Sequence, residues 1–254
     1  MNVVILTQND PFFLAENLEY LLSEIPQKIC ISGCVVFDAS PFGINENFFQ
    51  KAKKTFDIFG FRFFIRYALL FLKNKFDKTK DVKAVLKKFG IPIIHLNDSI
   101  NSEKSLREIR KFKPDLLVSI AANRIFKKQL IELAPKGCLN LHTALLPKYR
   151  GLMPSFWVLR NNEKHTGVSV FFVDEGIDSG PILVQKMIEI GDKTWAKLIQ
   201  HTKKIGMQAI LEAIELIYNG NYKVIENDYR KMSYYTFPSK KDVKKFVKAG
   251  KKFF

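Results

Sequence analysis

The stretch PDLLVSIAA at residues 114–122, followed after a short helical segment by CLNLH at residues 138–142, decides the fold of this chain. Both runs are short and largely apolar, as expected for strands buried inside a sheet. A helical pattern at residues 126–133 lies between them and ends at a Pro-Lys-Gly turn. Strand, helix and strand in this order predict one unit of a parallel sheet.

The same alternation continues on both sides of this unit. We therefore predict an α/β fold, in which a mainly parallel, twisted, Rossmann-like sheet has helices on both faces. Residues 1–220 form the expected main domain, and residues 221–254 form a basic, aromatic C-terminal tail. The other expected strands are residues 1–7, 28–39, 91–96, 166–173 and 182–190, the other expected helices are 12–25, 81–89, 102–112 and 195–218, and residues 40–47 are an expected loop.

The composition limits the class of protein. The chain has 254 residues and a net charge of +16, which favours anionic partners such as nucleic acid, a nucleotide-linked substrate or a membrane surface. Lysines scattered over a solvated surface explain the charge equally well. The sequence has no run of about 18 apolar residues and no recognisable signal peptide, so we expect a cytoplasmic protein.

The three cysteines, Cys30, Cys34 and Cys138, are odd in number and lack paired metal-ligand spacing. They predict free thiols in a reducing compartment. Cys30 and Cys34 lie in an apolar strand-like run, so we expect both of them to be buried.

Residues 58–76, IFGFRFFIRYALLFLKNKF, are unusually aromatic and basic. One interpretation is a helix with a wide buried face, whose basic side chains reach past it to solvent. The other is an interfacial membrane helix or a face on which a partner docks.

Two polar segments stand at the ends of predicted strands. Asn140 and His142 are two residues apart, so in a strand their side chains emerge on the same face. Asp178 closes the turn DEGID at residues 174–178, after another strand. A single histidine of this kind is more often structural, and the aspartates alone fit an ordinary turn or a cation site. A buried asparagine, however, costs stability unless it is partnered.

Together, GCLNLHTALLPKYRG at residues 137–151 and TGVSVFFVDEGIDSGPI at 166–182 resemble the formyltransferase family that uses 10-formyltetrahydrofolate. Its members include glycinamide ribonucleotide, methionyl-tRNA and sugar N-formyltransferases. The family pattern is Asn-x-His, then Leu-Leu-Pro, then an aspartate in a D-x-x-x-D turn. The resemblance is specific over residues 115–190 and weakens toward both ends of the chain.

This resemblance implies a catalytic set of Asn140, His142 and Asp178. A substrate amine attacks the formyl carbon, and the amide of Asn140 and a protonated His142 donate hydrogen bonds to the oxyanion of a tetrahedral intermediate. Asp178 holds His142 or an ordered water and assists proton transfer from the amine to the folate nitrogen. The resemblance implies 10-formyltetrahydrofolate as cosubstrate and no metal.

Binding positions are also implied. The pterin ring of the folate is expected between two stretches, in which backbone groups do much of the binding, and core packing is the alternative for Ile125 and Phe126. Arg150 is expected to pair with a diphosphate and Trp157 to stack on a ring of the acceptor, against the alternatives of a surface arginine and a core tryptophan. The implied folate-binding residues are Arg124, Ile125, Phe126, Asp174, Glu175 and Gly176, and the implied acceptor-binding residues are Asn9, Asp10, Arg150 and Trp157.

The identity of the amine acceptor depends on weaker signals. Residues 7–12, TQNDPF, lack the glycines that let backbone approach a phosphate, which counts against glycinamide ribonucleotide. Roughly 35 residues follow the last predicted helix, too few for the barrel of methionyl-tRNA formyltransferases. We therefore expect a nucleotide-linked amino sugar as acceptor, with a methionyl-tRNA formyltransferase-like enzyme as the alternative.

An alternative of another class is a basic RNA- or membrane-surface-binding protein with an unused catalytic remnant. The intact set of Asn140, His142 and Asp178 counts against it, because a remnant tolerates the loss of a member. Transfer RNA, a peripheral membrane contact and a homodimer all stay open as partners.

Overall fold

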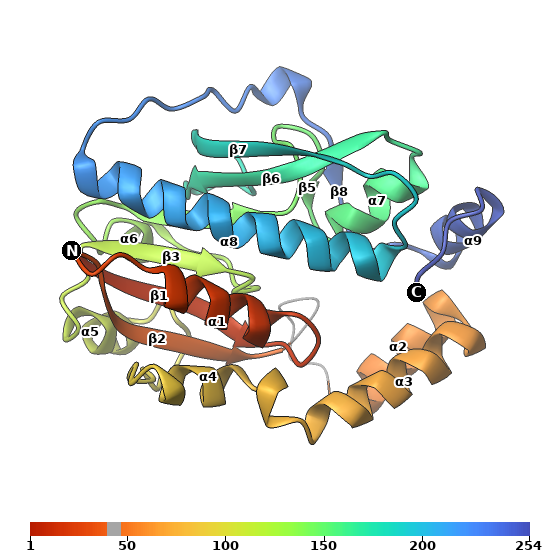
Figure 1. Ribbon diagram of the computed structural model, residues 1–254, viewed down its shortest axis with the longest axis horizontal. Helices are drawn as coiled ribbons and strands as arrows, with labels where there is room; N and C mark the ends of the chain where they lie inside the picture. The colour runs from red at the N-terminus through yellow and green to blue at the C-terminus, as the bar shows by residue number, and fades with distance from the viewer. Residues whose placement is uncertain (40–46) are drawn as a thin grey trace.

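A six-stranded sheet forms the centre of the computed structural model, which describes residues 1–39 and 47–254 (Figure 1). Its strands are, in spatial order, β2 (Cys30–Asp38), β1 (Asn2–Asn9), β3 (Leu116–Ile120), β4 (Cys138–His142), β6 (His165–Phe172) and β7 (Ile182–Glu189). The first four pair in parallel, and β6 runs antiparallel to β4 and β7. The predicted fold class is confirmed. The predicted loop at 40–47 lies outside the described residues except for Asn47.

Helices cover both faces of the sheet (Figure 1). One face is covered by α1 (Leu14–Glu24), α4 (Val82–Lys88) and α8 (Trp195–Asn219), and the other by α5 (Glu103–Arg110) and α6 (Lys128–Ile131). In β1, Val3 and Ile5 pack toward α1 and α8, while Val4 and Leu6 pack toward α5. Because both faces are buried, the strands read as continuous apolar runs.

The edge of the sheet beside β2 differs from the prediction. Residues 91–96 do not form a strand, because they pair with the sheet only through the single bridge of Ile93 to Cys34. Pro92 has no N–H, and its carbonyl accepts a hydrogen bond from the backbone of Cys34 at 3.0 Å. Cys34 is buried as predicted, and burial raises the pKa of its thiol, whereas Cys30 is exposed, so that prediction was wrong.

Residues 58–76 do not form one helix. Here α2 (Phe48–Phe59) ends at Gly60, whose φ of +82° breaks the backbone direction, and α3 (Phe61–Lys75) begins there. The expectation of a wide buried face was wrong, because only Phe63 and Asn74 of α3 are buried. Over residues 1–39 and 47–254, no helix combines the length and apolar character needed to cross a bilayer.

The segment after α8 packs back onto the loop that follows β4. There β8 (Tyr234–Tyr235) pairs in parallel with β5 (Arg150–Gly151), and α9 (Lys240–Lys248) packs on α7 (Pro154–Arg160). Phe246 of α9 is fully buried and stacks on Phe253 with ring centroids 4.5 Å apart. The domain boundary at residue 220 stays a prediction.

Candidate active site

The structure brings His142 and Asp178 together at the carboxyl end of β4. The imidazole is buried, and its Nδ1 lies 3.4 Å from Oδ2 of Asp178. Its Nε2 lies 2.7 Å from the backbone carbonyl oxygen of Tyr149, which can only accept a hydrogen bond. Both ring nitrogens thus face hydrogen-bond acceptors.

Asn140 emerges from the same face of β4 as His142. It lies between Ser119 of β3 and Phe171 of β6 in the strand register, and it is half-buried. Within the described part of the chain, its side-chain amide has no hydrogen-bond partner. This amide is not engaged by another described residue and is only half-buried, so it is available to bind a ligand.

Asp178 is held in place by several contacts. Its backbone has a left-handed φ of +49°, and its Oδ2 accepts a hydrogen bond from the backbone N–H of Gly151 at 2.8 Å. The side-chain amide of Asn227 donates to the backbone carbonyls of Asp178 and Gly180, both at 2.9 Å. The C-terminal segment therefore supports the catalytic turn, a role that the sequence did not reveal because Asn227 stands in no recognisable pattern.

Arg150 is the anchor of this support. Its guanidinium is buried and donates to the side-chain and backbone oxygens of Asn227 at 2.8 and 3.1 Å. The predicted pairing of Arg150 with an acceptor diphosphate does not fit this placement, because the guanidinium is turned into the protein.

The loop between β4 and β5 is fixed by two polar side chains of the neighbouring strands. Ser169 Oγ donates to the carbonyl of Ala144 at 2.7 Å and accepts from the N–H of Leu146 at 3.1 Å. Gln185 Nε2 donates to the carbonyl of Leu146 at 3.0 Å. These bonds set the path of the chain toward Tyr149, whose carbonyl holds His142. The sequence signal was a serine inside an apolar strand, which had no assigned role.

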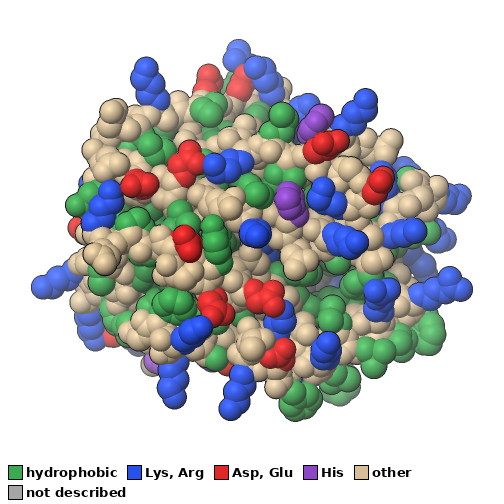
Figure 2. Space-filling model, in the orientation of Figure 1, with side chains coloured by type: hydrophobic (Ala, Val, Ile, Leu, Met, Phe, Trp, Pro, Cys, Tyr) green, Lys and Arg blue, Asp and Glu red, His purple; other side chains and the backbone are tan. Residues whose placement is uncertain are grey.

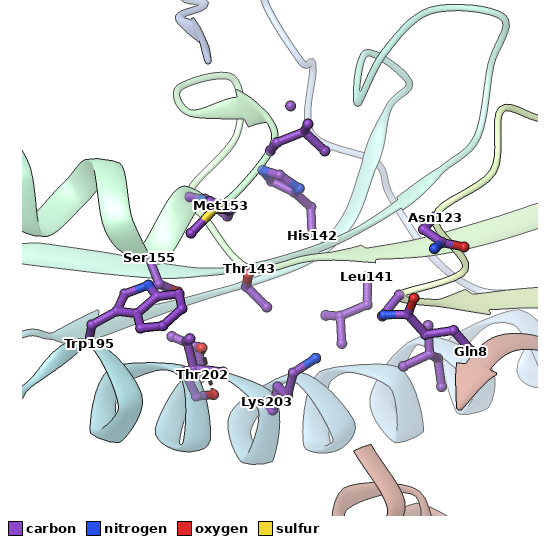
Figure 3. Close-up of a pocket in the computed structure, with 16 residues that line it drawn as sticks. Gln8, Asn123, Leu141, His142, Thr143, Met153, Ser155, Trp195, Thr202 and Lys203 are labelled. Atoms are coloured by element: carbon purple, nitrogen blue, oxygen red, sulfur yellow. Dashed lines mark hydrogen bonds between the residues drawn. The ribbon is translucent and has the colours of Figure 1, made fainter. Parts of the chain in front are cut away.

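A cavity of about 350 Å³ opens beside His142, lined by the ends of β1, β3 and β4 and by α8 (Figure 3). Met153 and Trp195 line one end of it, and Gln8 and Lys203 line the other. Gln8 Oε1 is buried and has no hydrogen-bond partner among the described residues. The cavity therefore combines an apolar end with a polar end that offers an acceptor and a cation.

Lys203 was missed by the sequence analysis. Burial lowers the pKa of its ammonium, and the carboxylate of Asp10 acts in the opposite direction. In the part of the chain that the structure describes, no carboxylate lies within ion-pair distance of it. The signal was its position four residues after Ile199 on the apolar side of a long helix, where a lysine is unexpected.

The other predicted acceptor residues lie in different surroundings. Asn9 Oδ1 accepts from the N–H of Val82 at 3.1 Å, so it is engaged at the start of α4. The indole of Trp157 is buried, stacks on Tyr235 with centroids 4.7 Å apart and donates to the carbonyl of Thr236 at 3.0 Å. This is the core tryptophan of the alternative interpretation, and its ring faces have no room for a ligand.

The two predicted folate stretches lie beside β4. The N–H of Val173 donates to the carbonyl of Cys138 at 2.7 Å, so the turn that follows runs back over the strand. In that turn Asp174 Oδ1 accepts from the N–H of Gly176 and the hydroxyl of Ser179, at 3.0 and 2.5 Å, and Glu175 is exposed.

In the other stretch, Phe126 is in the core, and the guanidinium of Arg124 lies 5.2 Å from the ring centroid of Phe37. Ile125 is 76% exposed rather than in the core, and Ile177 on the facing turn is 52% exposed. Exposed apolar side chains on both loops and the unpartnered amide of Asn140 fit a planar, polar-edged ring such as a pterin. The binding roles of both stretches stay predictions.

Over the described ranges, no cluster of three or more His, Cys, Asp or Glu side chains is arranged to hold a metal ion.

Comparisons with known proteins assign the family. A profile described as formyl transferase matches residues 73–214. A methionyl-tRNA formyltransferase of Kosmotoga olearia is 36% identical over 162 residues, which is 63% of this chain and 52% of that protein. The Thermotoga maritima methionyl-tRNA formyltransferase is 32% identical over 163 residues, 64% of this chain and 52% of that protein. The chain thus spans about half the length of these relatives.

Solved structures share the fold. A sugar N-formyltransferase from a Shewanella species aligns with a TM-score of 0.61 at 20% identity, covering 98% of this chain and 87% of that one. A phosphoribosylglycinamide formyltransferase from Anaplasma phagocytophilum aligns with a TM-score of 0.62 at 16% identity, covering 92% and 98%. The profile matches more than half of the chain, so the chain belongs to the formyl transferase family. The resemblance read from the two segments around Asn140 and Asp178 is confirmed.

Proposed function

We propose that this protein transfers a formyl group from 10-formyltetrahydrofolate to a primary amine. The observation that carries the proposal is the set of three side chains on and above β4. His142 has hydrogen-bond acceptors at both ring nitrogens, Asp178 lies beside it, and the amide of Asn140 is unpartnered on the same face. The folate supplies an electrophilic formyl carbon bound to a nitrogen that can leave.

His142 and Asn140 stabilise the charge that develops on the formyl oxygen. The contact of His142 Nδ1 with Asp178 is long, at 3.4 Å, whereas Nε2 is held at 2.7 Å by Tyr149. The Nδ1–H makes no short hydrogen bond within the protein, so it is the donor available to the formyl oxygen, and the amide of Asn140 is the second donor. Each such donor contributes on the order of 3 kcal/mol to lowering the barrier.

Asp178 moves the proton. As the new C–N bond forms, the attacking amine becomes acidic, and the carboxylate accepts its proton directly or through a water. The same proton passes to the folate nitrogen as the old C–N bond breaks.

For the acceptor we favour the aminoacyl end of methionyl-tRNA over the amino sugar expected from the sequence. Identities of 32–36% to methionyl-tRNA formyltransferases and the net charge of +16 support this choice. The apolar end of the cavity, at Met153 and Trp195, suits an unbranched apolar side chain. A nucleotide-linked amino sugar is the second candidate, because the cation of Lys203 in the cavity suits an anionic group.

The test is a transfer assay with purified protein and 10-formyltetrahydrofolate. Methionyl-tRNA, nucleotide-linked amino sugars and glycinamide ribonucleotide are compared as acceptors, and product mass reports the added formyl group. We expect formylated methionyl-tRNA from the wild type and none from the Asp178→Asn variant. Transfer to the amino sugar alone would reverse the order of the two candidates, and no transfer to any of these amines would overturn the proposed reaction.

A further inference from the structure

The outer side of α3 carries a row of large exposed apolar side chains. They stand 4, 4, 3 and 4 residues apart, which places them along one side of the helix. Their exposed fractions run from 41% to 82%. We call this row the α3 stripe, and its members are Phe61, Ile65, Leu69, Leu72 and Phe76.

The opposite side of α3 already has partners in the fold. Phe63 packs against Phe253 and Phe254, with ring centroids 4.9 and 5.4 Å away. Tyr67 stacks on Phe12 at 4.7 Å. At the end of the helix, the amide of Asn74 donates to the carbonyl of Pro11 at 2.9 Å. These contacts fix the orientation of α3, so the α3 stripe is a second apolar face that this packing leaves outside.

Cations flank the α3 stripe. Arg62, Lys73 and Lys75 are exposed beside it, and the sequence of α3 contains no acidic residue. The neighbouring α2 adds exposed Phe49 and Phe56 and a basic run in which Lys53 is ion-paired with Asp57 at 2.6 Å. Figure 2 shows green and blue side chains gathered together at its lower right, where α2 and α3 protrude in Figure 1.

We propose that the α3 stripe and its flanking cations dock on an anionic lipid bilayer. A helix with an apolar row and basic edges lies in the plane of a membrane surface, with the apolar side chains inserted at the headgroup boundary and the cations on lipid phosphates. A second copy of this chain is a poorer occupant, because a symmetric contact would bring the cations of two α3 helices together. The α3 stripe is on the side of α3 opposite Phe63, whose ring centroid lies 6.1 Å from that of the cavity residue Trp195. The proposal does not rest on the formyl-transfer reaction.

Vesicle co-sedimentation of the full chain tests the proposal. The vesicles are phosphatidylcholine alone, or phosphatidylcholine with about 30% phosphatidylglycerol. The stripe variant is Leu69→Ser with Leu72→Ser, and its matched control replaces two exposed apolar residues elsewhere, Met187→Ser with Val224→Ser. The charge variant is Arg62→Gln with Lys73→Gln, and its control is Lys136→Gln with Lys223→Gln.

We expect the wild type and both controls to bind the anionic vesicles and to bind phosphatidylcholine weakly. The stripe variant should lose about tenfold or more of its affinity, and the charge variant should lose most of its preference for anionic vesicles. Circular dichroism is measured on each variant to check that it is folded. Absence of wild-type binding at low salt would overturn the proposal, as would equal binding by the stripe variant. A wild-type dimer in sedimentation equilibrium that the stripe variant converts to a monomer would assign the surface to a second copy instead.

Discussion

Two regions depart from ordinary burial in opposite directions. One is the carboxyl end of β4 with the loops around it, which we call the catalytic edge of the sheet, and the other is the hairpin formed by α2 and α3. At the edge, polar groups such as His142 and Arg150 are inside the protein, whereas on the hairpin large apolar groups such as Phe61 and Phe76 are outside. Buried polar groups cost stability unless they are partnered, and exposed apolar groups lose the stabilisation that burial would give. In the proposed reaction the first region meets a substrate, and in the proposed docking the second region meets a membrane surface.

After loss of Asp178, the largest effect is expected for loss of an oxyanion donor. Asn140→Ala and His142→Asn should each lower kcat/KM for formyl transfer by roughly 10²–10³-fold, because each removes a hydrogen bond that strengthens as charge develops. His165→Asn changes an exposed histidine and serves as the control. Steady-state kinetics measure the effect. Near-wild-type rates in both variants would show that Asn140 and His142 do not stabilise the oxyanion.

Arg150→Met should weaken both stability and turnover. It leaves two oxygens of Asn227 without their donor, which costs about 1–3 kcal/mol in the free energy of unfolding. It also loosens the turn that positions Asp178, so kcat should fall on the order of tenfold. Urea denaturation and kinetics measure the two effects. A raised KM for the acceptor with unchanged stability would instead mean that the guanidinium contacts substrate.

Lys203→Met should raise stability while raising the KM for the acceptor roughly tenfold, through loss of a charged hydrogen bond. Burial lowers the pKa of Lys203 in the folded state, so the unfolded state binds its proton more tightly. The stability of the wild type relative to the variant is lowest below the folded pKa and recovers as pH rises toward the ordinary value of 10.5.

The urea midpoint of the wild type should therefore lie below that of the Lys203→Met variant at neutral pH. The difference between the two midpoints should shrink at alkaline pH. Lys204→Met, at an exposed position on the same helix, is the control and should show neither effect. A pH-independent gap between Lys203→Met and the wild type would contradict the assigned burial of the ammonium.

The smallest effect is expected at the hairpin. Leu69→Ser with Leu72→Ser should change the free energy of unfolding by less than about 1 kcal/mol and leave formyl transfer unchanged, because both side chains are already exposed. Urea denaturation and kinetics test this. A large loss of stability would show that the α3 stripe is covered within the folded chain, and the two regions would no longer contrast.

The sequence predicted what local pattern controls. Apolar runs placed the strands, and the spacing of Asn140 and His142 placed both side chains on one face of β4. It did not predict contacts between distant segments. Arg150 donates to Asn227, 77 residues away, and Trp157 donates to the carbonyl of Thr236. Both side chains therefore hold the C-terminal segment in place, whereas the sequence predicted that they contact a ligand. The sequence analysis did not single out Lys203, because the apolar residues of α8 dominate the periodic pattern of that helix.

The hairpin shows the same limit. Residues 58–76 are rich in apolar side chains, and composition alone does not say which side of a helix is covered. The break at Gly60 and the packing of Phe253 on Phe63 decide that, and both depend on the three-dimensional path of the chain.

The Asp178→Asn variant tests whether Asp178 and the residues beside it on β4 transfer a formyl group. Asparagine keeps the shape of the side chain and tolerates the left-handed backbone, so the fold should persist. Transfer from 10-formyltetrahydrofolate to methionyl-tRNA is measured beside folate binding, with Asp192→Asn, at an exposed position, as the control. We predict that kcat falls by roughly 10²–10⁴-fold while folate affinity and thermal stability match the wild type. Transfer by Asp178→Asn at the wild-type rate would contradict the proposed mechanism.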